Sequence, residues 1–369
     1  MPMSKIDYTE AILELEAFLD GCAEHPDLQM EQLSGAGAVF EIENRLSHYY
    51  EKRFALTFSS ATTAMQALCL AYELKGAEIV TSPFNWGGSI TPFFLSKNKI
   101  RFAGFDHDSL SLCAEDLSKA VTTKTKAVVS VDYNGIPADS MAIKSYCQER
   151  RLIYISDSAQ SLGAFRDGKP AGYFADAIVL SFSPGKSVYA GEGGAIVTDD
   201  ETLYEDLLKV AHHPSRQKMV AGLSCSSEFT PLNGRINPLA AILLNKSFLA
   251  SLTVLRKKQE KWFKELKELQ NKGLVHLPAV LRHPNSITYF RTILLIEEPF
   301  SIADVYDYLQ RINANITVSD PDLLPIPTNR TFLRQFKGKF SCSEHLKEQL
   351  TRFNSNRYLK LSANTFGSL

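Results

Sequence analysis

The chain has 369 residues, of which 44% are hydrophobic and 22% are charged, and its formal net charge is -1 at pH 7. A chain of this length can bury a substantial core and is expected to divide into a large and a small domain. The near-zero charge argues against a general nucleic-acid or acidic-membrane binder, and 6 cysteines without a CxxC pair predict reduced thiols, no metal framework and a cytoplasmic location.

The N-terminal part of the chain predicts neither export nor membrane insertion. Residues 1–7 carry no basic segment followed by an apolar stretch, and no apolar run is expected to span a bilayer. A helix is expected near residues 7–22, and strands and helices alternate from about residue 53 to residue 209. Such alternation predicts an α/β fold with a mostly parallel central sheet and helices on both faces.

Two polar segments follow apolar runs in the first half of the chain. Residues 57–63 are rich in Ser and Thr and lead into a helix-like run, so Ser60, Ala61 and Thr62 could bind an anion with hydroxyls and helix N-terminal amides. The alternative is an ordinary N-cap without a ligand. Trp86 precedes two glycines, and its ring could lie against a planar ligand or pack in the core.

An acid and a lysine follow two later apolar runs. Asp157 ends an expected strand and precedes Gln160, at the sheet edge where ligands bind, although it could instead cap a helix or turn. Lys186 comes five residues after Ser181 and before a glycine cluster. A lysine kept neutral by burial can form a Schiff base with pyridoxal phosphate, provided that the protein supplies an anion for the ring nitrogen, a phosphate cradle and a stacking partner. The hypothesis is a Schiff-base lysine.

The order of these segments resembles that of the sugar-nucleotide aminotransferases of the DegT/StrS type, which are pyridoxal phosphate enzymes of fold type I. The resemblance runs from about Ser34 to about Ile242. It implies that Lys186 is the covalent cofactor lysine, that Asp157 pairs with the pyridine nitrogen and that Gln160 reaches the ring oxygen. The other implied cofactor contacts are Trp86, which would stack on the ring, and Ser60, Ala61, Thr62 and Ser181, which would hold the phosphate.

The resemblance also implies an assembly and a reaction. Asn233 matches a residue that crosses to the neighbouring subunit's phosphate, which implies a homodimer with shared active sites. Lys186 would act as nucleophile and general acid/base in a ping-pong transamination from an amino donor, glutamate in this family, to a nucleotide-linked keto-sugar. The alternatives are another pyridoxal phosphate reaction (elimination, decarboxylation or condensation) in a specialised biosynthetic pathway, or a non-catalytic regulatory homologue. Family members that are dehydratases carry histidine at the lysine position, so Lys186 argues against that branch.

Three further residues are candidate substrate contacts. His212 and His213 stand where the family has a His-Gly pair, and they could touch substrate or end a helix. Arg291 lies in an expected strand at residues 286–296 and could pair with a substrate carboxylate or phosphate, or lie at the surface. Because the chain departs from the family pattern beyond Ile242, the sequence leaves the amine acceptor open.

The second half of the chain predicts a bridge to a smaller domain. Residues 255–269 alternate charges at helical spacing, which predicts an amphipathic helix between the domains, and residues 302–310 predict a further helix. The expected division is a large cofactor-binding domain at residues 1–245, followed at residues 246–369 by the linking helix and a shortened α+β domain.

Overall fold

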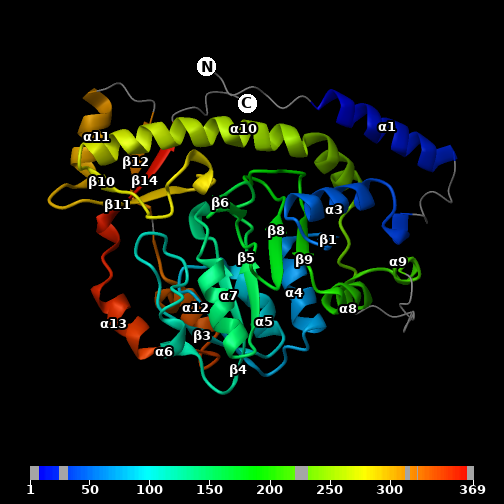
Figure 1. Ribbon diagram of the computed structural model, residues 1–369, viewed down its shortest axis with the longest axis horizontal. Helices are drawn as coiled ribbons and strands as arrows, with labels where there is room; N and C mark the ends of the chain where they lie inside the picture. Colours follow the sequence, from blue (N-terminus) through cyan, green and yellow to red (C-terminus); the bar gives the residue numbers. More distant parts are fainter. Residues whose placement is uncertain (1–7, 25–31, 221–231, 312–315, 322, 364–369) are drawn as a thin grey trace.

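The computed structural model describes residues 8–24, 32–220, 232–311, 316–321 and 323–363 (Figure 1). An eight-stranded sheet occupies the centre of the molecule, and a four-stranded sheet lies beside it. The helix expected near residues 7–22 is α1 (Thr9–Glu24), although its first expected residue lies outside the described residues. Two short strands, β6 (Phe165–Arg166) and β7 (Lys169–Pro170), form a separate hairpin.

The large sheet is mostly parallel, as expected from the sequence. Its strand order is β1-β9-β8-β5-β4-β2-β3-β13. The bounds are β1 (Phe54–Phe58), β2 (Glu78–Thr81), β3 (Lys99–Phe102), β4 (Thr125–Val131), β5 (Ile153–Asp157), β8 (Ala177–Ser181), β9 (Gly194–Thr198) and β13 (Phe340–Cys342). Strand β9 is antiparallel to β1 and β8, whereas every other neighbouring pair is parallel.

Helices cover both faces of this sheet because its strands are apolar on both faces. Successive side chains of a strand point to opposite faces, so Val179 of β8 lies in one core and its neighbours Ile178 and Leu180 lie in the other. The first core contains residues of α4 (Ala61–Ala71), α5 (Gly87–Leu95) and α8 (Glu201–Ala211). The second contains residues of α3 (Ala38–Tyr49), α6 (Leu117–Ala120) and α7 (Ser140–Glu149).

The smaller sheet is antiparallel and has a core of its own. Its order is β10 (Val275–His276), β11 (Thr292–Ile296), β14 (Tyr358–Ala363) and β12 (Ile316–Ser319), and α11 (Ile302–Arg311) confirms the helix expected at residues 302–310. The strand expected from residue 286 begins only at Thr292. The preceding segment instead binds a loop beyond β4, where the amides of Thr288 and Arg291 donate to the carbonyls of Gly135 and Asn134.

Helix α10 (Pro238–Asn271) joins the two sheets (Figure 1). Asn237 caps it by accepting a hydrogen bond from the amide of Leu239, and a proline occupies the first turn. Phe248 packs in the core of the large sheet, whereas Trp262, further along the helix, packs in the core of the small sheet. The bridging helix expected at residues 255–269 is therefore part of a longer helix that runs across the division expected at residue 245.

The C-terminal part of the chain returns to the large sheet. Strand β13 pairs in parallel with β3, and α12 (Arg330–Gln335) brings Phe332 against Phe94 of α5. The following helix α13 (Glu344–Arg352) places Leu346 in the same core. The division into residues 1–245 and 246–369 stays a prediction, but residues 330–352 pack with the first of these parts.

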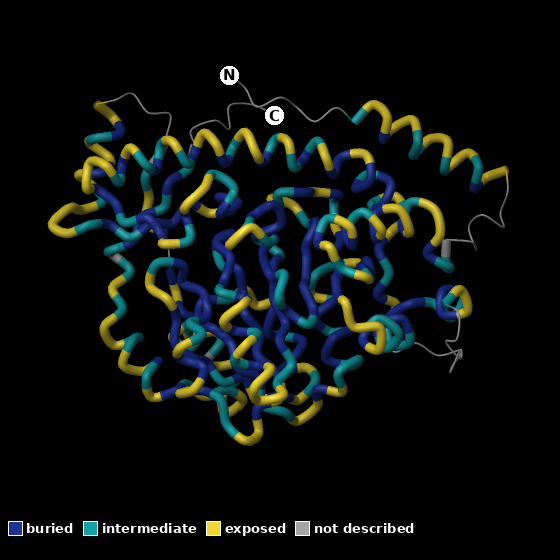
Figure 2. Tube along the Cα trace, viewed as in Figure 1, coloured by how far each residue is buried: buried dark blue, intermediate teal, exposed yellow. Residues whose placement is uncertain are grey.

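Among the described residues, α10 is long and apolar enough by length and composition to cross a membrane, which the sequence analysis did not anticipate. Many of its apolar side chains lie buried against the two sheets, and its buried residues alternate with exposed ones along its length (Figure 2). The core helix of a globular protein passes the same test, so this single helix is weak support for a membrane span.

Candidate active site

Asp157 is a buried carboxylate at the carboxyl end of β5, the edge at which the sequence analysis placed it. Ser89 Oγ donates a hydrogen bond to its Oδ2, and the amide of Ala159 donates to Oδ1 at 3.1 Å. Burial raises the pKa of Asp157, while these two donors and the charge of Lys186 partly offset that rise. The site therefore holds a carboxylate whose charge is only partly compensated and that favours a cationic partner.

Lys186 lies in the loop between β8 and β9 and is half-buried. Its amide donates to the carbonyl of Ser183 at 3.2 Å, and its Nζ lies 4.4 Å from the centre of the Phe290 ring. Burial lowers the pKa of Lys186, the charge of Asp157 opposes this, and the charge of Arg291 lowers the pKa further. The structure thus brings the predicted lysine and the predicted acid close enough for each charge to shift the pKa of the other group.

The predicted phosphate residues converge on Gly194. This glycine pairs with Ser181 of β8 on one side and with Phe58 of β1 on the other, and a Cβ placed on it would collide with the backbone nitrogen of Ala61. Ser60 is the N-cap of α4 and accepts a hydrogen bond from Thr63 at 3.0 Å, so the capping alternative is observed. Amides in the first turn of a helix have no intrahelical acceptor, which leaves this terminus suited to an anion as well.

Trp86 and Gln160 lie between Thr62 and Ser181 in the sequence, in two different loops. Trp86 is 67% exposed, which excludes the core-packing alternative. A Cβ on Gly88, two residues later, would lie 2.6 Å from Thr62 Oγ1, so the Trp86 loop sits against the start of α4. Gln160 Oε1 accepts a hydrogen bond from the amide of Asn134 at 2.9 Å, and its NH2 end is left as the donor for a ligand oxygen.

Sequence analysis missed two contacts of this site, those of Ser89 and Phe290. Ser89 lies three residues after Trp86, but its partner Asp157 is 68 residues further along the chain. Phe290 belongs to a segment that the sequence assigned to a strand, and it reaches Lys186 only because that segment docks on the loop after β4. No local sequence pattern predicts either contact. The available signal is proximity in sequence, because Ser89 follows Trp86 by three residues and Phe290 directly precedes Arg291.

The remaining candidates lie in different places. Arg291 is exposed but close enough to influence Lys186, as its effect on the lysine pKa indicates. His213 caps α9 (Pro214–Gln217), where its Nδ1 accepts a hydrogen bond from the amide of Ser215 at 3.1 Å, so it occupies a helix end. His212 is buried at the end of α8, packs on Phe58, and among the described residues its Nε2 has no hydrogen-bond partner. A substrate contact by any of the three stays a prediction.

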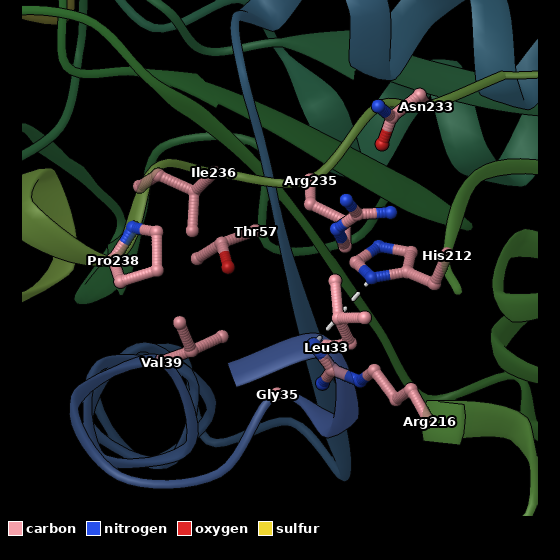
Figure 3. Close-up of a pocket in the computed structure, with 10 residues that line it drawn as sticks. All are labelled: Leu33, Gly35, Val39, Thr57, His212, Arg216, Asn233, Arg235, Ile236 and Pro238. Atoms are coloured by element: carbon pink, nitrogen blue, oxygen red, sulfur yellow. Dashed lines mark hydrogen bonds between the residues drawn. The ribbon is translucent and has the colours of Figure 1, made fainter. Parts of the chain in front are cut away.

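His212 and Asn233 line a cavity of about 260 Å³ beside β1 (Figure 3). The cavity combines cationic and apolar side chains, and in Figure 3 the Arg235 guanidinium and the His212 ring lie side by side. Asn233 is exposed, and the next residue, Gly234, accepts a hydrogen bond from the amide of Ser59 at 2.7 Å. The Asn233 segment therefore runs alongside the start of α4.

A buried ion pair forms one wall of this cavity region. The guanidinium of Arg216 donates to both carboxylate oxygens of Glu43, and Glu43 Oε1 also accepts hydrogen bonds of 2.7 Å from the amide and the hydroxyl of Thr57. Both side chains are almost fully buried. The pair is thus internally satisfied and links α3 and α9 to β1. Across the described residues, no group of three or more His, Cys, Asp or Glu side chains is placed to hold a metal ion.

Comparison with known proteins gives a consistent result. Residues 28–353 match the sequence profile of the DegT/DnrJ/EryC1/StrS aminotransferase family. The chain is 30% identical over 308 residues to a UDP-4-amino-4,6-dideoxy-N-acetyl-beta-L-altrosamine transaminase of Helicobacter pylori, covering 79% of this chain and 80% of that one. It is 24% identical over 268 residues to a GDP-perosamine synthase of Vibrio cholerae, covering 72% and 71%. The structure of NtdA from Bacillus subtilis with bound cofactor PMP superposes with a TM-score of 0.72 at 22% identity, covering 97% of this chain and 79% of that one, and supports the fold.

Proposed function

Because the chain belongs to the DegT/DnrJ/EryC1/StrS aminotransferase family, we propose that it moves an amino group from glutamate to the keto group of a nucleotide-linked sugar. The family membership makes it a pyridoxal phosphate-dependent transferase of fold type I. The names of the two relatives contain UDP- and GDP-linked amino sugars, which supports a nucleotide-linked acceptor. Glutamate as donor follows from the family resemblance.

The observation that carries this proposal is the electrostatic interaction between Lys186 and Asp157 at one edge of the sheet. A half-buried amine with a lowered pKa faces a buried carboxylate with a raised pKa. Each group would be costly to keep charged without a further partner. A cofactor with an electrophilic carbon for the amine and a cationic ring nitrogen for the carboxylate suits both, so the residues present fit pyridoxal phosphate.

Each remaining part of the site supports the same cofactor. We assign the start of α4, from Ser60 to Thr62, together with Ser181 to the phosphate, because they converge on Gly194. The exposed ring of Trp86 can lie against a planar ligand, and the NH2 end of Gln160 can donate to a ring oxygen. When bound, pyridoxal phosphate supplies an aldehyde for a lysine amine and a ring that draws electrons from the bond being broken.

Lys186 would move the proton in this reaction. Its Nζ is an acceptor only when neutral, and burial favours that form. The amine can therefore take a proton from the donor's α-carbon and return it to a neighbouring position, which is general acid/base catalysis by one group. Asp157 would supply its charge to the ring nitrogen, and Ser89 donates a hydrogen bond that holds the carboxylate in place.

The test is substitution of Lys186. We expect the wild-type protein to retain labelled cofactor on the peptide containing residue 186 after borohydride reduction, and Lys186→Ala to lose both this label and the visible absorbance of the bound cofactor. Lys264→Ala, at an exposed position on α10, is the matched control and should behave as wild type. A wild-type protein that binds the cofactor without forming this covalent bond would overturn the assignment of Lys186.

The reaction class has its own test. Glutamate should bleach the absorbance of the lysine-bound cofactor with release of 2-oxoglutarate, and a nucleotide-linked keto-sugar should restore it. If no amino donor has this effect while a substrate is still consumed, the reaction is an elimination, decarboxylation or condensation instead of a transamination.

We infer that the active form is a homodimer in which Asn233 serves the neighbouring subunit's phosphate site. Asn233 is exposed and borders a cavity lined by Arg235 and by His212, whose Nε2 has no partner within the described ranges; this setting favours an anion from outside the chain. Mixing Lys186→Ala with Asn233→Ala subunits tests this. A mixed dimer with shared sites has one site free of both changes and regains activity, whereas sites confined to single subunits regain none.

A further inference from the structure

We propose that Asp132 is a positioning residue, whose carboxylate fixes the loop that carries Asp157 and Gln160 in the geometry that the cofactor requires. Asp132 follows β4 directly, and β4 is the neighbour of β5 in the sheet. The inference rests on the proposed function, because it concerns how that site is held. It adds a residue that does not itself reach the cofactor.

The side chain of Asp132 bonds to both sides of the Gln160 position. Its Oδ2 accepts hydrogen bonds from Ser158 Oγ at 2.7 Å and from Ser161 Oγ at 2.6 Å. Its Oδ1 accepts from the amide of Ala138 at 2.8 Å, which ties down the far end of the loop after β4. One carboxylate therefore fastens two loops, and the two serines bracket Gln160.

The backbone of the same two loops adds two further links. The amide of Asp132 donates to the carbonyl of Asp157 at 3.1 Å. The backbone amide of Asn134 donates to Gln160 Oε1 at 2.9 Å. This bond fixes the orientation of the Gln160 side chain, so that its NH2 group is left to face a ligand. Both predicted ring contacts, Asp157 and Gln160, are thus bonded to the segment that Asp132 begins.

Gly172 packs closely behind Ser158. A Cβ on Gly172 would lie 2.5 Å from Ser158 Oγ and 2.9 Å from Ser156 Oγ, so only a glycine fits there. Asp132 itself is 1% exposed. Movement of the Ser158 hydroxyl toward Gly172 is blocked, and its position is set by Asp132 on the other side.

A carboxylate at this position is costly to bury. Burial raises the pKa of Asp132 to about 6; bonds from Ser161, Ala138 and Ser158 oppose the rise, and the charge of Asp157 adds to it. The folded-state pKa lies above the ordinary value of 3.8, so folding favours the protonated form, and above pH 6 the ionised group lowers stability. A buried acid that costs stability and has only neutral donors is expected where function requires it.

The experiment measures cofactor binding by the full-length protein. The dissociation constant of pyridoxal phosphate is determined by absorbance titration for wild type, Asp132→Ala and Asp132→Asn, together with thermal unfolding without cofactor. In Asp132→Asn, the side-chain oxygen can still accept from the amide of Ala138, and the NH2 group can donate to a serine whose hydroxyl rotates. This variant therefore preserves the links that Asp132→Ala removes. Ser247→Ala is the matched control, because Ser247 is equally buried and its hydroxyl donates to the carbonyl of Leu243 within α10, away from the Asp157 loop.

We expect Asp132→Ala to weaken cofactor binding about 10- to 100-fold, as loss of an outer partner does at metal sites, while Asp132→Asn and Ser247→Ala stay close to wild type. In a double-mutant cycle, the Asp132→Ala effect should largely disappear when Asp157→Asn and Gln160→Ala are already present. Equal and additive losses in both backgrounds would assign Asp132 a structural role only. Failure of the wild type to bind the cofactor would refute the proposed function, whereas wild-type affinity in Asp132→Ala would refute the positioning role alone.

Discussion

One buried acid lies beside the cavity next to β1 and another lies at the carboxyl-end edge of the large sheet, and the surroundings of the two acids differ. Glu43, beside the cavity, bonds to the guanidinium of Arg216 and to both donors of Thr57. Asp157, at the strand ends, accepts hydrogen bonds from one hydroxyl and one amide, and the nearby cation is Lys186, whose own pKa is lowered. A satisfied charge pair holds the fold together, whereas a buried charge with an incomplete set of partners indicates a site that a ligand completes.

The first prediction removes the satisfied pair. Glu43→Ala should lower the free energy of unfolding by about 3–5 kcal/mol, because it leaves the Arg216 charge buried without a partner. Urea unfolding of the cofactor-free protein measures this loss. The double change of Glu43 and Arg216 to Leu and Met should recover much of it, since a buried pair can be replaced by apolar groups of similar size. A loss below about 1 kcal/mol in Glu43→Ala would show that the pair is not a stabilising element.

The second prediction removes the charge of the acid at the strand-end edge. Here we expect a large loss of activity and no loss of stability. Asp157→Asn should lower kcat/KM by about 10²- to 10³-fold, as loss of an electrostatic contact in an active site does. Because burial raises the pKa of Asp157 above 3.8, the ionised form lowers stability at neutral pH, and the cofactor-free variant should be as stable as wild type or more so. Steady-state kinetics and urea unfolding of the same preparation measure both effects. A variant that is destabilised as strongly as Glu43→Ala would remove the distinction between the two regions.

The sequence predicted the strand-end edge better than the cavity region, and the reason is physical. Asp157 and Lys186 each follow an apolar run of β-forming residues, and parallel strands bring their carboxyl ends to one edge. Sequence order was enough to place them near each other, as it was for the start of α4 and Ser181, which meet at Gly194. The mostly parallel sheet and the bridging helix were predicted on the same basis, from alternation and periodicity.

Contacts between segments that are distant in the sequence were not predictable in this way. Glu43 and Arg216 are 173 residues apart, and neither lies in a pattern that marks a buried pair. The strand expected from residue 286 begins at Thr292 because the residues before it bind the loop after β4. β13 lies next to β3 although the sequence assigned it to a separate small domain. In each case tertiary contacts decided the outcome, and local patterning carries no information about them.

The third prediction changes the pKa of Lys186 by substituting a neighbouring residue and leaving the lysine itself unchanged. The positive charge of Arg291 lowers the pKa of Lys186, after burial, so Arg291→Ala should raise that pKa. The pH at which the cofactor becomes attached to the lysine should then move upward, by less than about one unit because an exposed charge is screened by solvent and salt. Absorbance titration against pH measures the shift. Arg282→Ala, which removes an exposed arginine elsewhere, should leave the profile unchanged, and a downward shift in Arg291→Ala would contradict the electrostatic account.

The fourth and smallest effect concerns Asp108 and Glu297, two partly exposed acids that share the titratable partner His276. His276 of β10 lies with Nε2 3.1 Å from Asp108 Oδ2 and Nδ1 3.2 Å from Glu297 Oε1, so both ring nitrogens can donate only when the ring is protonated. Burial alone would lower the pKa of His276, but bonds to Asp108 and Glu297 outweigh it and raise the pKa above 6.5. The bridge therefore contributes its full stability below pH 6.5 and loses it as the pH rises through the raised pKa. His276→Gln should cost less than about 1 kcal/mol in acid and nothing in alkali, by urea unfolding at each pH. A cost that does not change with pH would mean that packing, and not charge, accounts for the contact between β10 and Asp108.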